Sequence, residues 1–231
     1  MVQNTNKENP RKHSQEQYFT KHPTSSPSPD SFSCTVQGVR CMFQSSAGVF
    51  SKSRLDPASS LLVEASLLEL KSRGVKASLS KVAFLDLGCG IGTVGIFAKR
   101  SFLGSLLDVT FSDVNERALA LARRNIKWNG INGVDRESCH VIFSDGFSNP
   151  SLAEARFDVI AFNPPQHAGK ELCNRLIREA VEHLSQGGAL LVVARHNRGG
   201  SSFCIVMEEA VGNAQTFLKQ GIFRVYRAVH A

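Results

Sequence analysis

Apolar and polar residues follow one another along this chain in blocks that fit strands and helices. Short runs of mainly apolar residues, which are typical of buried parallel strands, lie at residues 82–87, 106–111, 139–143, 157–162 and 189–194. Longer segments with apolar residues near helical spacing lie at residues 57–71, 115–128, about 170–185 and about 201–210. Strands and helices that alternate in this way predict an α/β protein with a doubly wound, mostly parallel sheet.

The two ends of the chain have their own patterns. Residues 1–31 are rich in Ser, Pro, Asn, Gln and Lys, and such a composition does not bury enough apolar surface to fold. We therefore expect residues 1–31 to be a disordered polar tail and linker, and residues 32–231 to form one domain. Alternating residues around Gly38 predict a pair of strands at 35–43, and the pattern around Gly221 predicts a C-terminal antiparallel hairpin.

The composition narrows the class of protein. Of 231 residues, 42% are hydrophobic and 20% are charged, which suits one α/β domain with a tail. No segment approaches the roughly 18 apolar residues of a membrane span, and the N-terminal segment lacks the apolar stretch of a secretory signal. The six cysteines are scattered without a C-x-x-C pair, so we expect free thiols, no metal site and a cytoplasmic location. The formal charge of +7 favours an anionic partner such as nucleic acid.

A glycine-rich segment joins the strand at 82–87 to a predicted helix that runs to about residue 102. Residues Gly90–Gly95 match the G-x-G-x-x-G pattern, in which glycines let the backbone turn tightly and approach a ligand at a helix N-terminus. By itself this pattern fits a dinucleotide site. Asp86 lies inside the strand, however, and a carboxylate there opposes a pyrophosphate and suits a ligand with an ammonium or sulfonium group.

Polar side chains also follow the next three strands, at the edge where open α/β sheets bind ligands. Asp113 is placed to accept hydrogen bonds from ribose hydroxyls. Asp145, followed by Gly146, is placed to accept a hydrogen bond from an adenine amino group, although an Asx turn would explain it as well. Residues 163–166 (Asn-Pro-Pro-Gln) present an amide at the same edge, because the two prolines force the chain out of the sheet; the alternative is a simple turn that ends a strand.

Together these residues resemble a class I S-adenosylmethionine-dependent methyltransferase. The resemblance rests on residues 86–92 (Asp-Leu-Gly-Cys-Gly-Ile-Gly), on Asp113 and Asp145, and on Asn-Pro-Pro at 163–165. Three further segments are similar to the methyltransferase small domain, whose members include ribosomal RNA guanine-N2 methyltransferases and a compact archaeal relative: residues 48–57, 163–170 and 223–228. The resemblance implies a seven-stranded, Rossmann-like methyltransferase sheet and S-adenosylmethionine as the cofactor.

The resemblance also implies roles for individual residues. Asn163 Oδ1 and the Pro164 carbonyl would accept hydrogen bonds from the amino group that is methylated, and would so aim its lone pair at the methyl group. The cofactor would contact Asp86, Gly88, Cys89, Gly90, Gly92, Asp113, Val114, Asp145, Gly146 and Asn163. The substrate would contact Phe50, Lys52, Arg54, Pro165, Gln166 and His167. Similar amino-methyltransferases usually have Tyr or Phe after the two prolines to stack on the flipped base; because this chain has Gln166 there, we expect the stacking residue elsewhere, with Phe50 as a candidate.

These observations favour methyl transfer to an exocyclic amine of RNA, with guanine N2 of ribosomal RNA as the expected acceptor. A protein glutamine amide is an alternative acceptor, since its planar amide also fits Asn-Pro-Pro. A non-catalytic RNA-binding module of the same fold is a further alternative, against which Asp86, Asp113 and Asn163 argue together. A nicotinamide-dependent oxidoreductase would leave Asp86 unexplained. We expect RNA as the partner, no association with a membrane, and a monomer or homodimer.

Overall fold

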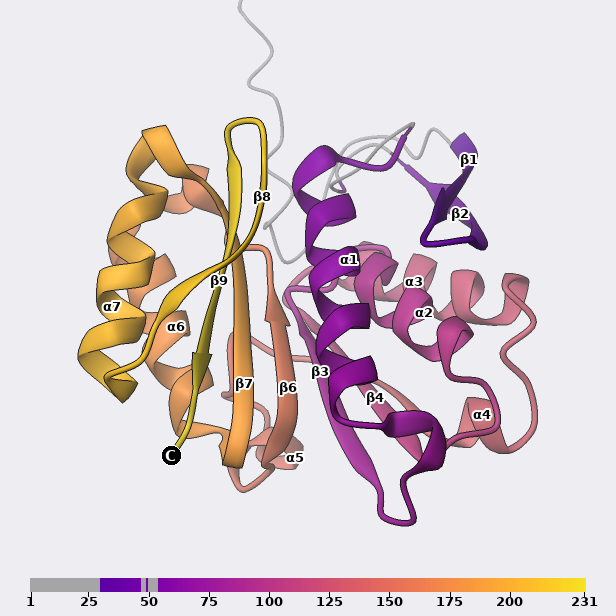
Figure 1. The fold of residues 1–231 in the computed structure, drawn as a ribbon. Coiled ribbons are helices and arrows are strands. Elements are labelled where there is room, and N and C mark those ends of the chain that lie inside the picture. Colours follow the sequence, from indigo (N-terminus) through magenta and orange to yellow (C-terminus); the bar gives the residue numbers. More distant parts are fainter. Residues whose placement is uncertain (1–29, 47–48, 50–53) are drawn as a thin grey trace, which may run out of the picture.

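The computed structural model describes residues 30–46, 49 and 54–231, except for the side chain of Arg198. Within these residues the main element is a seven-stranded sheet with the order β5-β4-β3-β6-β7-β9-β8 (Figure 1). Its strands are β3 (Val82–Leu87), β4 (Leu107–Asp113), β5 (Cys139–Phe143), β6 (Phe157–Phe162), β7 (Leu184–Arg195), β8 (Gln215–Gln220) and β9 (Phe223–Val229). Strands β3 to β7 pair in parallel, whereas β9 is antiparallel to both β7 and β8. This confirms the doubly wound, mostly parallel sheet with its C-terminal hairpin.

Helices cover both faces of this sheet (Figure 1). One face carries α1 (Pro57–Ser72), α2 (Thr93–Ser101) and α3 (Glu116–Trp128), and the other carries α6 (Lys170–Glu182) and α7 (Ser201–Val211). Neighbouring residues of β3 point to opposite faces, so that Phe84 packs with the first group of helices and Leu85 with the second. A strand that is buried on both faces explains why residues 82–87 are an almost continuous apolar run.

Several bounds differ from the sequence-based expectation, and those around β7 show why. The strand predicted at 189–194 begins at Leu184, and the preceding helix ends at Glu182. The prediction stopped at two glycines, but the structure keeps both in β7, because Gly187 N–H donates to His230 O at 2.8 Å and His230 N–H donates to Gly188 O at 2.9 Å. Short helical turns, which the sequence pattern did not indicate, lie in the connections: η1 (Val75–Ala77), α4 (Val134–Glu137), α5 (Pro150–Ala153), η2 (Gln166–Ala168) and the π-helical η3 (His196–Gly200).

A separate two-stranded hairpin, β1 (Asp30–Val36) with β2 (Val39–Ser45), packs on α3. Asn125 pairs with both backbone groups of Gln44, at 2.7 and 3.1 Å, and Asn129 pairs in the same way with Met42, at 2.9 and 2.7 Å. The two amides therefore satisfy one edge of β2 as a neighbouring strand would. β1 begins at Asp30, two positions before the expected domain boundary, so Asp30 and Ser31 of the predicted tail belong to a strand. Residues 1–29 lie outside the described residues, and their disordered state stays a prediction.

A buried carboxylate ties the C-terminal hairpin to α1. Glu69 is 2% exposed and binds Arg227 Nε of β9 at 2.7 Å and Arg73 Nε at 2.9 Å. Burial acts to raise the pKa of Glu69, but the two arginines outweigh it and the pKa is lowered. This contact holds β9 beside α1, and so fixes where the start of β9 lies relative to the first turn of that helix. None of the helices in the described ranges is both long and apolar enough to cross a bilayer.

Candidate active site

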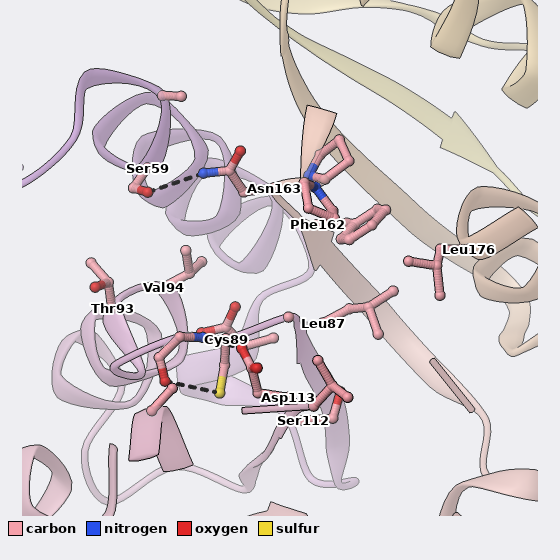
Figure 2. Close-up of a pocket in the computed structure, with 18 of the residues that line it drawn as sticks. Ser59, Leu87, Cys89, Thr93, Val94, Ser112, Asp113, Phe162, Asn163 and Leu176 are labelled. Carbon is pink, nitrogen blue, oxygen red and sulfur yellow. Dashed lines mark hydrogen bonds between the residues drawn. The ribbon is translucent and has the colours of Figure 1, made fainter. Parts of the chain in front are cut away.

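A cavity of about 450 Å³ lies at the carboxyl ends of β3, β4, β5 and β6, beside the first turns of α1 and α2 (Figure 2). Small-molecule sites have volumes of about 300–1,000 Å³. Most of the residues predicted for the site line this cavity: Asp86, Gly88, Cys89, Gly90, Asp113, Val114, Asp145, Gly146, Asn163, Pro164, Pro165, Gln166 and His167. The parallel sheet therefore brings residues from four separate strand ends to one place, as open α/β sheets do.

Of the other four predicted residues, Arg54 and Gly92 are described by the structure, and neither lines the cavity. Arg54 is exposed and does not line the cavity, while Phe50 and Lys52 lie outside the described residues, so that their roles stay predictions. Gly92 precedes α2 with a φ of 85°, and a Cβ there would lie 3.2 Å from the Cβ of Ala122 on α3. This glycine therefore lets two helices approach each other, and it does not line the cavity.

The glycine-rich loop turns sharply along the wall of the cavity. Gly88 and Gly90 have φ values of 64° and 55°, which side chains disfavour. Gly90 N–H donates to Asp113 Oδ2 at 2.8 Å, which joins the loop to the end of β4. Gly95, the last glycine of the pattern, lies within α2, and a Cβ there would be 2.3 Å from the Phe111 ring. The glycines of this segment thus have two roles. Gly88 and Gly90 let a ligand approach the backbone, and Gly95 lets α2 pack closely on β4.

Asp86 places a buried carboxylate against the cavity. The residue is 3% exposed, and its Oδ2 accepts a hydrogen bond from Gly95 N–H at 2.8 Å. Burial is the main reason that the pKa of Asp86 is raised to about 7; the Gly95 N–H opposes this rise, and the charge of Asp113 adds to it. Among the described residues no cationic side chain forms an ion pair with Asp86. A cationic ligand would supply the missing countercharge.

Asp113 adds a second carboxylate to the same cavity, close enough that its charge acts on Asp86. Its two oxygens accept hydrogen bonds from the backbone N–H groups of Gly90 and Asn115, both at 2.8 Å. Burial raises the pKa of Asp113, against the lowering effect of these N–H groups. Each carboxylate oxygen has a further lone pair that a ligand hydroxyl can use. Two carboxylates at one end of the cavity favour a cationic ligand and oppose a pyrophosphate, as argued for Asp86 from the sequence.

Asp145 lies at the exposed side of the cavity. Its side chain is 52% exposed and pairs with Arg175 of α6 at 3.2 Å, while Arg175 also binds Glu179 at 2.6 Å. The ion pair therefore links the end of β5 to α6. Gly146 follows with a φ of 56°, and a Cβ there would lie 2.6 Å from Glu179 Oε2, so the loop passes close to α6.

Asn163 leaves β6 with its amide anchored on α1. Asn163 Nδ2 donates to Ser59 Oγ at 3.2 Å, across 104 residues of sequence (Figure 2). Ser59 lies in the first turn of α1, where its backbone N–H donates to the N-cap carboxylate of Asp56 at 2.9 Å. This contact directs the nitrogen of the amide toward α1 and leaves Oδ1 as an acceptor. After Asn163, the Pro164 carbonyl accepts a hydrogen bond from Gln166 N–H at 2.8 Å, which forms the turn that ends the strand.

Sequence reasoning missed several lining residues, and among them are Ser59, Arg195 and Phe223. Arg195 ends β7 and Phe223 begins β9, and the two are register partners in the sheet. The Arg195 guanidinium carbon lies 5.6 Å from the centre of the Phe223 ring, within the range of a cation–π contact. Phe223 belongs to a segment that carried the family resemblance but had no assigned role, so only its position in the fold reveals it.

A parallel sheet that ends in an antiparallel hairpin, with a glycine-rich loop and acidic residues at adjoining strand ends, defines a methyltransferase of the Rossmann-like class. Residues 40–227 match the methyltransferase small domain family, and the chain belongs to this family. Members of this family use S-adenosylmethionine, which confirms the predicted type of enzyme and its cofactor.

Individual relatives agree with this class. YbxB, an uncharacterized protein of Bacillus subtilis, is 30% identical over 213 residues, which are 92% of this chain and 98% of that protein. Ribosomal RNA small subunit methyltransferase C of Actinobacillus pleuropneumoniae serotype 7 is 35% identical over 184 residues, which are 78% of this chain and 49% of that protein. The solved structure of the T. thermophilus 16S rRNA N2 G1207 methyltransferase (RsmC), in complex with AdoMet and guanosine, has a TM-score of 0.73 and 27% identity, over 90% of this chain and 52% of that one. The chain thus spans about half the length of these ribosomal RNA methyltransferases.

Proposed function

We propose that this protein transfers the methyl group of S-adenosylmethionine to an exocyclic amino group of RNA, namely guanine N2 of ribosomal RNA. The observation that carries this proposal is the anchored amide of Asn163. Its nitrogen binds Ser59 Oγ at 3.2 Å, so its oxygen is the atom left to accept a hydrogen bond in the cavity. An exocyclic amine has the two hydrogens that this oxygen and a neighbouring carbonyl can hold.

The neighbouring carbonyl is that of Pro164. It accepts one hydrogen bond from Gln166 N–H at 2.8 Å and has a second lone pair for a substrate hydrogen. Asn163 Oδ1 and Pro164 O would each hold one hydrogen of the amino group, and would so direct the nitrogen lone pair toward the reacting carbon. S-adenosylmethionine supplies a methyl group on a positively charged sulfur. The two oxygens would also stabilise the positive charge that develops on nitrogen as the N–C bond forms and the C–S bond breaks. The amine would then release one proton, so the step needs no nucleophilic side chain.

The buried acids fit the cofactor. We assign Asp86 to the positively charged part of S-adenosylmethionine, because this carboxylate has no cationic partner in the described part of the chain. We assign Asp113 to the ribose hydroxyls and Asp145, held by Arg175, to the adenine amino group. The glycine-rich loop, Cys89, Val114 and Gly146 would complete this part of the cavity.

Three observations support RNA as the substrate. Two relatives that are 35% and 36% identical to this chain over 184 and 187 residues are ribosomal RNA methyltransferases by name. The solved relative with the TM-score of 0.73 was determined with guanosine. The formal charge of +7 suits a polyanion. The chain spans about half the length of those relatives, so both the acceptor nucleotide and the choice of RNA are proposed for it.

Transfer of a tritiated methyl group to total RNA and to total protein, both from cells that lack this protein, tests the proposal. We expect label in RNA, and mass spectrometry of the nucleosides should identify N2-methylguanosine. Asn163→Ala should abolish the transfer and keep the calorimetric affinity for S-adenosylmethionine within a few-fold of wild type. Label in protein would point to a glutamine acceptor, label in neither would point to a non-catalytic module, and an active Asn163→Ala variant would contradict the assigned role of the amide.

A further inference from the structure

An aromatic residue on β9 lines the cavity in which Gln166 follows the two prolines. Phe223, at the start of β9, lines the same cavity as Asn163 and Gln166. Its ring lies 5.6 Å from the guanidinium carbon of Arg195. Because Arg195 and Phe223 are register partners of β7 and β9, the antiparallel ladder fixes this pair at the rim of the cavity.

Gln166 is part of the same wall. Its Oε1 accepts a hydrogen bond from Arg195 N–H at 3.4 Å, so its side chain bridges the loop after β6 to the end of β7. The next backbone group, His196 N–H, donates to Ile222 O at 3.0 Å and continues the ladder past Phe223. Gln166, Arg195 and Phe223 therefore form one connected side of the cavity.

Phe223 also borders a second hollow of about 550 Å³. The other residues of this hollow come from the segment before α1, from α1 itself and from the β8–β9 turn: Leu55, Pro57, Ser60, Gln220, Gly221 and Ile222. Ile222 is 52% exposed, so its side chain is accessible at the edge of this hollow. The Phe223 residue thus lies between the cavity that contains Asn163 and a surface hollow with apolar walls.

We propose that the Arg195–Phe223 pair is the surface on which the methyl-accepting base stacks, and that the hollow beyond Phe223 holds the adjacent nucleotide of the RNA. This inference rests on the proposed function. Unpaired RNA bases stack on aromatic rings and on guanidinium planes, and this pair presents one of each to the cavity. An RNA chain that continues past Phe223 enters the hollow, where Leu55 and Ile222 offer apolar contacts to a base and its sugar.

Three variants separate the parts of this inference. Phe223→Leu keeps an apolar side chain and removes the ring. Ile222→Ser changes the hollow and leaves the cavity intact. Phe217→Leu is the matched control, because Phe217 on β8 forms the equivalent pair with Arg227, at 5.8 Å, and lines neither hollow.

Calorimetric titration with guanosine and with a guanosine-centred RNA trinucleotide, both in the presence of S-adenosylhomocysteine, measures the effect. We expect Phe223→Leu to weaken both ligands about tenfold, which is the usual scale for loss of one stacked base. Ile222→Ser should weaken only the trinucleotide, and Phe217→Leu should change neither. If Phe223→Leu binds guanosine and the trinucleotide as tightly as wild type, the proposed stacking role is wrong. If Ile222→Ser binds the trinucleotide as tightly as wild type, the proposed site for the adjacent nucleotide is wrong.

Methyl transfer to RNA distinguishes a failure of this inference from a failure of the proposed function. In the same variants the affinity for S-adenosylmethionine should stay at the wild-type value, which shows that the fold is intact. If the wild type methylates RNA and Phe223→Leu does so with an unchanged KM for RNA, the inference alone is wrong. If the wild type methylates no RNA, the proposed function is wrong and this inference with it.

Discussion

The buried carboxylate of Asp86 should make the ligand-free protein less stable as the pH rises. Its pKa is about 7, compared with the usual 3.8, chiefly because burial disfavours the charged form. Between about pH 4 and pH 7 the folded chain therefore keeps a proton that the unfolded chain has released. Linkage then requires the free energy of unfolding to fall as the pH rises through this window, and to level off above it.

The size of the effect follows from the pKa difference. Each pH unit within the window lowers the free energy of unfolding by about 1.4 kcal/mol, so that the Asp86 contribution falls by roughly 3 kcal/mol between about pH 4.5 and pH 8. In Asp86→Asn the side chain has no charge to desolvate, and it keeps an oxygen that can accept from Gly95 N–H, a bond of 2.8 Å in the wild type. The free energy of unfolding of the variant, minus that of wild type, should therefore rise by roughly 3 kcal/mol over this range. The new NH₂ group can change this difference by a constant amount, but it does not change the rise.

Urea unfolding of wild type and Asp86→Asn without cofactor, at several pH values, measures this difference. A difference that stays constant across the range would refute the reasoning, because it would mean that the wild-type carboxylate titrates alike in the folded and unfolded chains. The gain in stability should come with a loss of function. At about pH 8 the variant should bind S-adenosylmethionine at least about tenfold more weakly in calorimetry, since the carboxylate assigned to the cationic cofactor is absent.

Four further substitutions and one control test other contacts in and near the site. Asp113→Ala should weaken S-adenosylmethionine binding by roughly 1.5–3 kcal/mol in calorimetry, because a charged acceptor is lost; unchanged affinity would contradict its assigned role. Ser59→Ala should lower kcat about tenfold at an unchanged cofactor KM, since the Asn163 amide, which is proposed to hold the acceptor amine, loses its anchor; the matched control Ser66→Ala, buried on the same helix, should not. Asn125→Ala and Asn129→Ala should each lower the free energy of unfolding by roughly 2–3 kcal/mol, but only the first should also weaken cofactor binding, because Asn125 Nδ2 also donates to the glycine-rich loop at 3.0 Å. Equal cofactor affinities in these two variants would show that this loop contact is not used.

Much of the fold could be predicted from the sequence because its signals are local. Residues 82–87 are apolar on both faces, which is typical of a central parallel strand, and β3 is such a strand. Asp56 before Pro57 predicted the start of a helix, and Asp56 does cap α1. Gly221 marked the turn of the C-terminal hairpin. Each of these signals involves residues that are close in the chain, so the pattern of one sequence contains them.

The early part of β7 was missed for the opposite reason. Gly187 and Gly188 read locally as a break, but their backbone groups pair with His230, more than forty positions away. The position of Asp145 after a strand was visible in the sequence, but its ion pair with Arg175 on α6 was not. A contact between two elements that are distant in the chain produces no periodic pattern of residues, so the sequence contained no sign of these contacts.

The sequence by itself indicated the type of enzyme and the cofactor through the family resemblance. It also predicted that residues at consecutive strand ends lie together, because the carboxyl ends of parallel strands meet at one edge of the sheet. Only the tertiary structure decided what surrounds Asn163. Ser59 reaches it because α1 packs across the end of β6, and Arg195 and Phe223 reach the cavity because β9 pairs antiparallel with β7. Long-range pairing and helix packing set these contacts, and a single sequence does not encode them in any local pattern.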